Sequence, residues 1–175
     1  MAISKGKAGV GGLVCSVAAI IAIVMSNGTV RTNKAGLELI GNAESCRRDP
    51  YNCPAGILTD GIGNTHGVKA GTIKTNEQIA ADWERNILDA EACVNRYGNG
   101  RNLGDNTFSA MTSLTFNVGC GAIRTSTAFK LLNSGRITEA CNQLSRWVYS
   151  GKQLLPGLVI RRDKERTLCL TKDKV

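Results

Sequence analysis

The first apolar stretch of the chain runs from residue 8 to residue 26 and contains no charged side chain. At about 1.5 Å of rise per residue, a helix of this length just spans the roughly 30 Å hydrocarbon core of a bilayer. Lys5 and Lys7 precede the stretch, which favours an amino end that stays in the cytoplasm. Many glycine, alanine and serine residues dilute it, so its retention by a membrane is expected to be marginal. The pattern predicts a membrane-inserting segment over residues 1–30 and a folded body over residues 31–175.

Two other interpretations of this segment stay open. One is a cleavable signal peptide, since Val24 and Ser26 would stand at the small-residue positions before a cut. The other is a helix buried in a soluble core. The uncharged length favours uncleaved insertion over both.

Downstream of residue 28, helical apolar spacing alternates with glycine-rich stretches. Residues 33–45 have the spacing of a helix that carries Glu44 in its last turn. Residues 51–71 place proline and glycine between short apolar pieces, which predicts a small β-hairpin region. Thr75 and Gln78 form a capping box that starts a helix with Trp83 on its apolar face. Further helices are expected over 105–118, 126–133, 137–147 and 158–171. This is an α+β pattern, with a small β-hairpin lobe beside a larger helical lobe.

The net charge of +8 predicts a surface that attracts polyanions, such as nucleic acid, anionic lipid headgroups or the acidic bacterial wall. The basic residues are spread along the chain and adjoin only at 47–48 and 161–162. They form no ribbon interleaved with aromatic residues. Nucleic acid is therefore not an expected partner.

Seven cysteines are unusual for a chain of 175 residues in a reducing compartment. None falls in a CxxC pair and His66 is the only histidine, so neither a zinc site nor any other metal or cofactor is expected. His66 itself is expected in a loop. The cysteines instead predict disulfides formed outside the inner membrane. Because seven is odd, complete oxidation within one chain leaves at least one thiol outside any bridge.

One short stretch carries candidate chemistry. Glu44 ends the first predicted helix of the body, Cys53 follows nine positions later, Thr59 six positions after that, and then comes Gly61-Ile62-Gly63. With Tyr51, this spacing resembles the active-site stretch of the phage-type lysozymes, glycoside hydrolase family 24. The segments at 116–119, 124–127, 146–147 and 157–166 also resemble that family, so the resemblance covers roughly residues 34 to 170.

The resemblance implies a lysozyme-like α+β fold and a monomeric muramidase that hydrolyses the β-1,4 bond between N-acetylmuramic acid and N-acetylglucosamine in peptidoglycan. Glu44 would be the general acid of an inverting reaction, and Thr59 would help to hold the attacking water. Cys53 stands where the family more often has aspartate, so a thiolate would have to polarise that water. Phe116 would stack against a sugar ring, or else pack as a buried aromatic side chain in the core. Arg161 is a possible ion-pair partner of Glu44.

Taken alone, Glu44 has the alternative of an ordinary exposed carboxylate at a helix end. Asp49 and Asp60 are rival carboxylates, but neither has the family spacing, and we expect Asp49 to cap a turn before Pro50. Cys53 has the alternative of a structural disulfide, for example with Cys46.

The chain also resembles the signal-arrest-release endolysins, which insert by a weakly hydrophobic N-terminal segment and stay inactive until they leave the membrane. Our hypothesis is that Cys46 and Cys53 pair in the tethered form. After release, the Cys15 thiol attacks Cys46, forming a Cys15–Cys46 bridge and releasing Cys53. For the fixed bridges we prefer Cys141 with Cys169, and Cys93 with Cys120 follows by elimination, although spacing alone leaves connectivity open.

The same resemblance implies delivery by the secretion translocon, tethering on the periplasmic side of the host inner membrane, later release into the periplasm, and a functional link to a holin. Two rival functions remain at this point. A lytic transglycosylase also needs one glutamic acid but makes anhydro sugar ends, and a wall-binding or membrane-anchored basic protein needs no catalytic residue.

Overall fold

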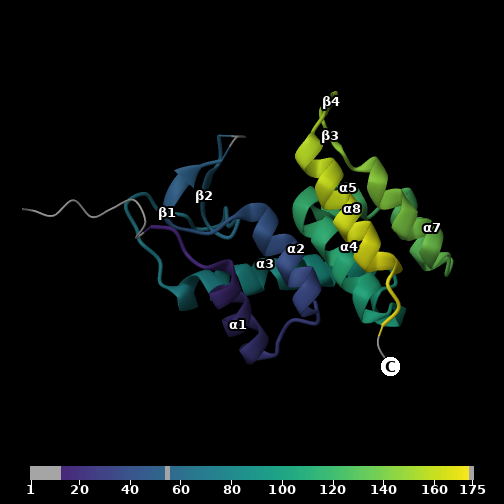
Figure 1. Ribbon diagram of the computed structural model, residues 1–175, viewed down its shortest axis with the longest axis horizontal. Helices are drawn as coiled ribbons and strands as arrows, with labels where there is room; N and C mark the ends of the chain where they lie inside the picture. Colours follow the sequence, from purple (N-terminus) through teal and green to yellow (C-terminus); the bar gives the residue numbers. More distant parts are fainter. Residues whose placement is uncertain (1–12, 54–55, 174–175) are drawn as a thin grey trace, which may run out of the picture.

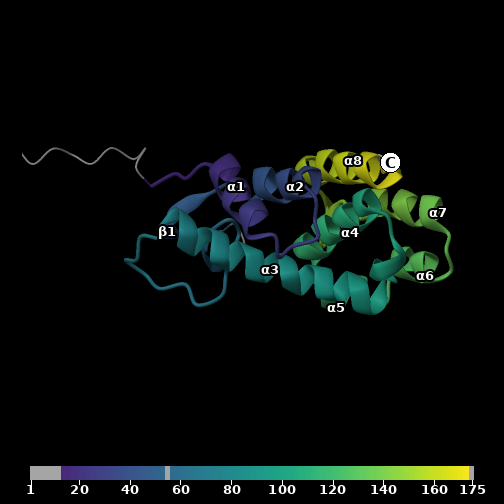
Figure 2. The same ribbon diagram turned by 90° about the horizontal axis from the view of Figure 1, so that it is seen from below.

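The computed structural model describes residues 13–53 and 56–173, which form a small β lobe and a larger helical lobe (Figure 1). The long helix α3 runs between the two lobes (Figure 2). The helices are α1 Val17–Asn27, α2 Lys34–Glu44, α3 Asn76–Tyr97, α4 Asp105–Val118, α5 Cys120–Ile123, α6 Thr127–Asn133, α7 Ile137–Asn142 and α8 Pro156–Leu170. The strands are β1 Arg47–Asn52, β2 Leu58–Gly61, β3 Tyr149–Ser150 and β4 Gln153–Leu154, in two antiparallel pairs.

The predicted α+β pattern is present, with local differences from the expected boundaries. The hairpin lies over β1 and β2 rather than over residues 51–71, because Arg47 already pairs with Gly61. Asp49 lies inside β1, where it accepts a hydrogen bond from Arg47 Nε at 3.1 Å, so the expected turn cap at Asp49 is wrong. The helix expected over 137–147 ends at Asn142 and continues as a 3-10 turn, Gln143–Arg146.

The N-terminal segment is part of the folded body from residue 13 onward. Leu13 O accepts a hydrogen bond from Arg48 N at 2.7 Å, so the chain enters alongside β1. Helix α1 then buries Ile20, Ile21 and Val24 in the same apolar cluster as Trp83 of α3. Residues 1–12 of the predicted membrane-inserting segment lie outside the described residues. Among the described helices, none is long and apolar enough to cross a membrane.

The helical lobe is built around α4, which is buried along most of its length. Phe108, Met111 and Leu114 of α4 are fully buried in a second apolar cluster that includes Phe129 of α6. Two disulfides cross-link this lobe, one between Cys93 and Cys120 and one between Cys141 and Cys169. From the sequence, Cys141–Cys169 was the preferred pair, and Cys93–Cys120 followed by elimination.

Helix α1 rests against a glycine of α2. A Cβ atom built on Gly41 would lie 2.5 Å from Val17 Cγ1 and 3.5 Å from the Trp83 ring. Valine is stiff about χ1, so it does not turn away easily. The close approach of α1 and α2 therefore requires a residue without a side chain at position 41.

We expect Gly41→Ala to destabilise the protein by about 1–2 kcal/mol relative to Gly121→Ala, because the new methyl group overpacks the α1–α2 contact. Gly121 is the matched control, since it is helical and a Cβ there meets nothing within 4 Å. Urea unfolding measures the difference, and hydrogen exchange should show the loss of protection in α1. Equal stability of the two variants would show that α1 docking does not depend on this contact.

Candidate active site

Glu44 is the last residue of α2, and its side chain lies against the turn that follows β2. A Cβ atom on Gly63 would lie 3.1 Å from Glu44 Oε2, and Gly63 has a φ of +66°. Both the space and the backbone conformation therefore require glycine at this position. The Glu44 side chain remains 25% exposed, so its carboxylate is held by the turn without being sealed off from solvent.

The second contact of Glu44 comes from the far end of the chain. Arg161 Nη1, near the start of α8, donates to Glu44 Oε1 at 2.8 Å across 117 positions of sequence. The Arg161 side chain is only 8% exposed. The ion pair considered from the sequence is therefore present, and it is shielded from solvent on the arginine side.

Arg161 is itself held by a buried carboxylate that the sequence analysis did not identify. Glu165 is fully buried, and its Oε1 accepts from Arg161 Nε at 3.1 Å and from Ser113 Oγ at 2.6 Å. Its Oε2 pairs with Arg162, whose Nε donates to Trp147 O at 3.0 Å. Burial lowers the pKa of the Arg162 guanidinium, although Glu165 opposes this effect. Two sequence signals were available for Glu165: its i, i+4 spacing from Arg161 and its place in the family-like segment 157–166.

The β1–β2 hairpin holds the other predicted site residues. Tyr51 is paired with Thr59, and Cys53 N donates to Ile57 O at 3.0 Å where the strands end. Thr59 is buried and its hydroxyl donates to Ile57 O at 2.9 Å, so its oxygen lone pairs remain available as acceptors. Burial raises the pKa of the Tyr51 hydroxyl, and electrostatic interactions with Glu44 and Cys53 raise it further. The hairpin residues and Glu44 therefore share one electrostatic environment.

Beside this site is a cavity of about 260 Å³ that Phe116 helps to line. Gly63 lines it from the turn that holds Glu44, and Asp89 lines it from α3. Phe116 is half-buried and packs against the apolar cluster that contains Trp83. It also lines this cavity, so it belongs to both the core and the cavity wall. His66 is exposed in the loop at the rim.

Cys46, two residues after Glu44, forms a disulfide with Cys15, with their Cα atoms 5.2 Å apart. The alternative Cys46–Cys53 bridge is therefore not the one in this structure. The three disulfides use six of the seven cysteines, and Cys53, half-buried at the end of β1, is the seventh. Over residues 13–53 and 56–173, no group of three histidine, cysteine or acidic residues is placed to hold a metal ion.

A set of ion pairs fixes the β lobe to α3. Lys74 Nζ lies 2.7 Å from Asp60 of β2 and 2.6 Å from Asp82 of α3. Arg85 lies 2.8 Å from the second oxygen of Asp82. Asp60, a rival catalytic carboxylate by sequence, is fully buried in this set, which assigns it a structural role.

Comparisons with known proteins agree with this geometry. Residues 41–165 match the family model described as phage lysozyme. The chain is 56% identical to the SAR-endolysin of Escherichia phage P1 over 179 residues, covering 95% of this chain and 97% of that protein. The structure superimposes on the active form of P1 phage endolysin Lyz with a TM-score of 0.89, at 56% identity, covering 91% of this chain and 96% of that chain. Against the secreted inactive form of the same endolysin the TM-score is 0.58, at 53% identity, covering 79% and 95%.

The ion pairs at Asp82 predict a pH effect on stability. Burial alone would raise the pKa of the Asp82 carboxyl, but the hydrogen bonds from Lys74 and Arg85 outweigh it and hold the pKa below its ordinary value of 3.8. The ion pairs therefore stabilise the fold above pH 3.8, and this contribution is lost as the pH falls through the folded-state pKa.

We expect Asp82→Asn to lower the free energy of unfolding at pH 7 by about 1–2 kcal/mol and to flatten its decline below the ordinary pKa. Denaturant unfolding from pH 7 down to acid conditions measures both effects. Asp89→Asn, an exposed position on the same helix, is the matched control. Parallel pH profiles for wild type and Asp82→Asn would contradict the assignment.

Proposed function

This chain belongs to the phage lysozyme family, the muramidase glycosidases, and from that membership we propose that it is a signal-arrest-release endolysin. Its reaction is hydrolysis of the β-1,4 bond between N-acetylmuramic acid and N-acetylglucosamine in peptidoglycan, which lyses the host. The observation that carries the proposal is Glu44 held between the Gly63 turn and the buried Arg161.

Glu44 acts as the general acid in this proposal. It gives its proton to the glycosidic oxygen as the bond breaks, which leaves a carboxylate on Glu44. Arg161 Nη1 is 2.8 Å from Glu44 Oε1 and stabilises that carboxylate by a charge-assisted hydrogen bond. The two contacts also fix the direction of the side chain, so the proton is delivered at one place in the cleft.

The β1–β2 hairpin supplies the attacking water. The Thr59 hydroxyl already donates a hydrogen bond to Ile57 O, so its oxygen can accept a hydrogen bond from the water. Cys53, which directly follows the last residue of β1, polarises the water as a thiolate and accepts the proton that the water loses. Attack from the face opposite the leaving group inverts the anomeric carbon and leaves a reducing end. The glycan lies along the cavity beside Gly63, with Phe116 against a sugar ring.

Activity is controlled by disulfide exchange. In the membrane-tethered form Cys46 pairs with Cys53, which occupies a catalytic position and distorts the loop between Glu44 and Thr59. On release, the Cys15 thiolate attacks Cys46 Sγ, the bond between Cys46 and Cys53 breaks, and Cys53 leaves as a thiolate. One disulfide replaces another, so no external oxidant or reductant is consumed.

Two findings support this order of events. Cys15 is bonded to Cys46, and the hydrogen bond from Cys15 N to Cys46 O, at 3.3 Å, aligns the two segments that carry them. The structure also resembles the active form of the P1 endolysin more closely than its secreted inactive form. The protein is then inactive at the periplasmic side of the inner membrane and active in the periplasm, with a functional link to a holin.

We expect Glu44→Gln to reduce cleavage of purified peptidoglycan by about 10²- to 10⁴-fold, because the variant has no proton to give to the leaving oxygen. The amide oxygen still accepts from Arg161, so the thermal unfolding curve should stay near that of wild type. New reducing ends measure the reaction, and anhydro sugar ends would instead indicate a lytic transglycosylase. A folded variant that cleaves normally would remove Glu44 from the mechanism.

We expect Cys15→Ser to accumulate in the periplasm without muralytic activity, with Cys46 bonded to Cys53, because no thiol remains to open that bridge. Thiol mapping by mass spectrometry, together with lysis assays, measures this result. Cys141→Ser, which alters a disulfide in the helical lobe, controls for the loss of any one bridge. Full activity of both Cys15→Ser and Cys53→Ser would leave the muramidase assignment standing and exclude the switch.

A further inference from the structure

A short hairpin projects from the helical lobe beside the start of α8. Figure 1 shows β3 and β4 reaching past the first turn of that helix. Tyr149 and Leu154 are paired directly across the two strands, so their side chains lie on one face of the hairpin. Tyr149 is 58% exposed and Leu154 is 47% exposed. The hairpin therefore presents two large apolar side chains to solvent.

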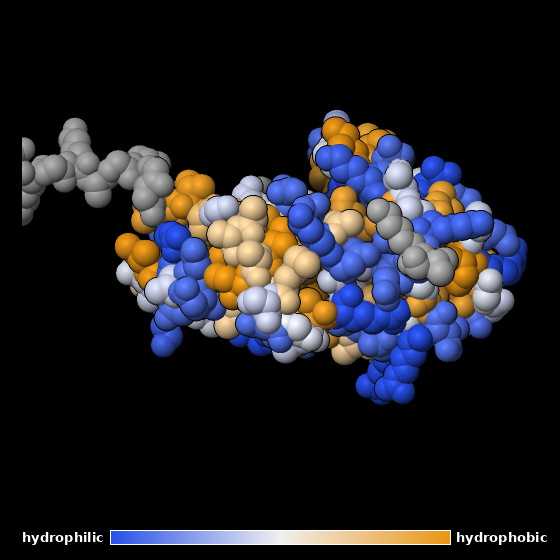
Figure 3. Space-filling model, turned by 60° about the horizontal axis from the view of Figure 1, so that its bottom comes forward, coloured by the Kyte–Doolittle hydropathy of each residue, from blue (hydrophilic) through white to orange (hydrophobic). Residues whose placement is uncertain are grey.

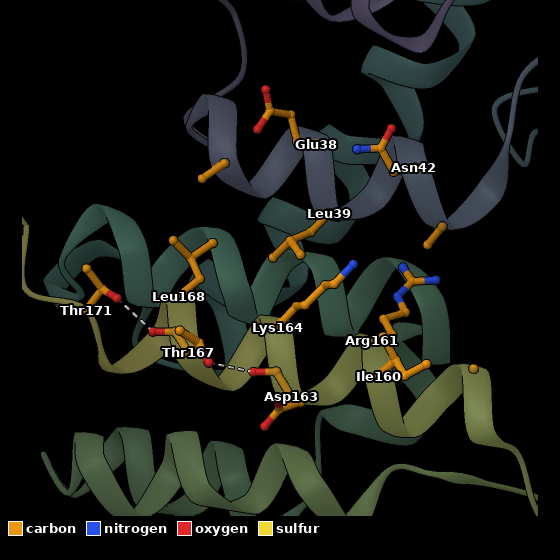
Figure 4. A pocket seen from close by; sticks show the side chains of 13 residues that line it. Glu38, Leu39, Asn42, Ile160, Arg161, Asp163, Lys164, Thr167, Leu168 and Thr171 are labelled. Carbon is orange, nitrogen blue, oxygen red and sulfur yellow. Dashed lines mark hydrogen bonds between the residues drawn. The ribbon is translucent and has the colours of Figure 1, made fainter.

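The start of α8 extends this apolar surface. Leu154 stands one position before the N-cap of α8 and Val159 four positions after it, where apolar side chains commonly pack together. Val159 is 41% exposed and Ile160 is 59% exposed. Figure 4 shows Ile160 beside Arg161 near the start of the helix, with Lys164 one turn further along. We call the four exposed apolar side chains the hairpin patch: Tyr149, Leu154, Val159 and Ile160.

Cationic side chains flank the hairpin patch along the chain. Lys152 lies in the turn between the two strands, and Arg146 and Lys164 are exposed before and after it. No acidic residue occurs between Glu139 and Asp163. In the space-filling view, hydrophobic and hydrophilic residues adjoin at the projecting top of this lobe (Figure 3). The hairpin thus combines apolar side chains with positive charge and has no carboxylate of its own.

The net charge of the chain also falls on this side of the molecule. Residues 96–175, which build most of the helical lobe, contain 13 lysine and arginine residues and five acidic residues. Residues 1–95 contain nine of each, so they contribute nothing to the net charge of +8. A charge distribution of this kind attracts the helical lobe toward an anionic surface.

We propose that the hairpin patch is a lipid contact, through which the released protein binds the surface of a bilayer with anionic headgroups. Tyrosine favours the headgroup region, because its ring is apolar and its hydroxyl is polar. The long stem of Lys152 lets its ammonium reach lipid phosphates while the apolar side chains enter the acyl boundary. The inference goes beyond the proposed muramidase reaction, and the proposed release from the inner membrane places the protein beside such a surface.

A protein partner fits the hairpin patch less well. A stable protein interface takes about 20 to 30 residues from each side, whereas the patch consists of a few side chains on a projecting tip. In a symmetric dimer through this patch, Lys152 of one copy would lie near the same cations of the other. No acidic residue of the stretch would neutralise them. A bilayer needs no matching concave surface and supplies the opposite charge.

Vesicle binding tests the contact directly. Wild type, the double variant Tyr149→Ser/Leu154→Ser and the control Ile73→Ser are mixed with phosphatidylcholine vesicles, with and without phosphatidylglycerol. We expect the double variant to bind the phosphatidylglycerol vesicles roughly tenfold more weakly than wild type, because two apolar side chains no longer insert. Ile73 is 66% exposed in the loop before α3, so Ile73→Ser removes a comparable apolar side chain elsewhere and should bind like wild type. Lys152→Glu should lose the preference for phosphatidylglycerol.

Trp147 reports which part of the protein meets the lipid. It lies two residues before Tyr149 and is half-buried, whereas Trp83 is fully buried in the core. Brominated phospholipids in the vesicles should therefore quench tryptophan fluorescence in wild type and Ile73→Ser, and much less in the double variant. Thermal unfolding and cleavage of purified peptidoglycan should be the same in all three proteins.

The outcomes separate the lipid contact from the proposed reaction. Absence of wild-type binding, equal binding by the double variant, or equal weakening by Ile73→Ser overturns the lipid contact. A double variant that loses cleavage but keeps vesicle binding would assign the hairpin to the substrate cleft instead. A wild-type dimer that the double variant dissociates would assign the patch to a second copy of the chain. Wild type that binds vesicles but cleaves no peptidoglycan leaves the lipid contact standing and overturns the proposed function.

Discussion

The Glu44–Arg161 ion pair is the interaction on which the arrangement of the site depends. It joins the end of α2 to the start of α8, two helices that lie far apart in the chain. Arg161 is held in place by Glu165, which is completely buried and also binds Arg162 and Ser113. A buried set of charges adds little to stability compared with apolar packing, but it penalises every arrangement that leaves one of its members without a partner. The network therefore selects one position for the Glu44 carboxylate.

The second constraint is the dual use of the N-terminal apolar segment. A stretch without charges is suited to a bilayer, and the same absence of charge lets Ile20, Ile21 and Val24 enter the core beside Trp83. The segment also packs closely on the body, since Val17 of α1 lies against Gly41 of α2, which has no side chain. In the proposed function, the loss of apolar burial when this segment leaves the membrane is partly offset, because the folded body offers another apolar environment.

The disulfide between Cys15 and Cys46 connects these two features. It bonds the N-terminal segment to Cys46, which lies two residues after Glu44 and directly before β1. Docking of α1 and the geometry of the site are therefore coupled through one covalent bond. The two bridges of the helical lobe lie in a different apolar cluster and have no such connection. The position of Cys46, rather than the number of cysteines, is what makes the proposed switch possible.

The sequence by itself determined the elements and the type of chemistry. Apolar periodicity and capping residues located α2, α4, α8 and the start of α3 to within a few residues, and the spacing from Glu44 to Gly63 indicated the family. These features are local, because a helix depends on neighbours three or four positions away. Only the tertiary structure decided that Cys46 pairs with Cys15, that Asp60 is an internal ion-pair partner, that Asp49 lies in a strand, and that Glu165 supports Arg161. Each of these outcomes depends on which distant segments meet, and no local pattern of residues specifies that.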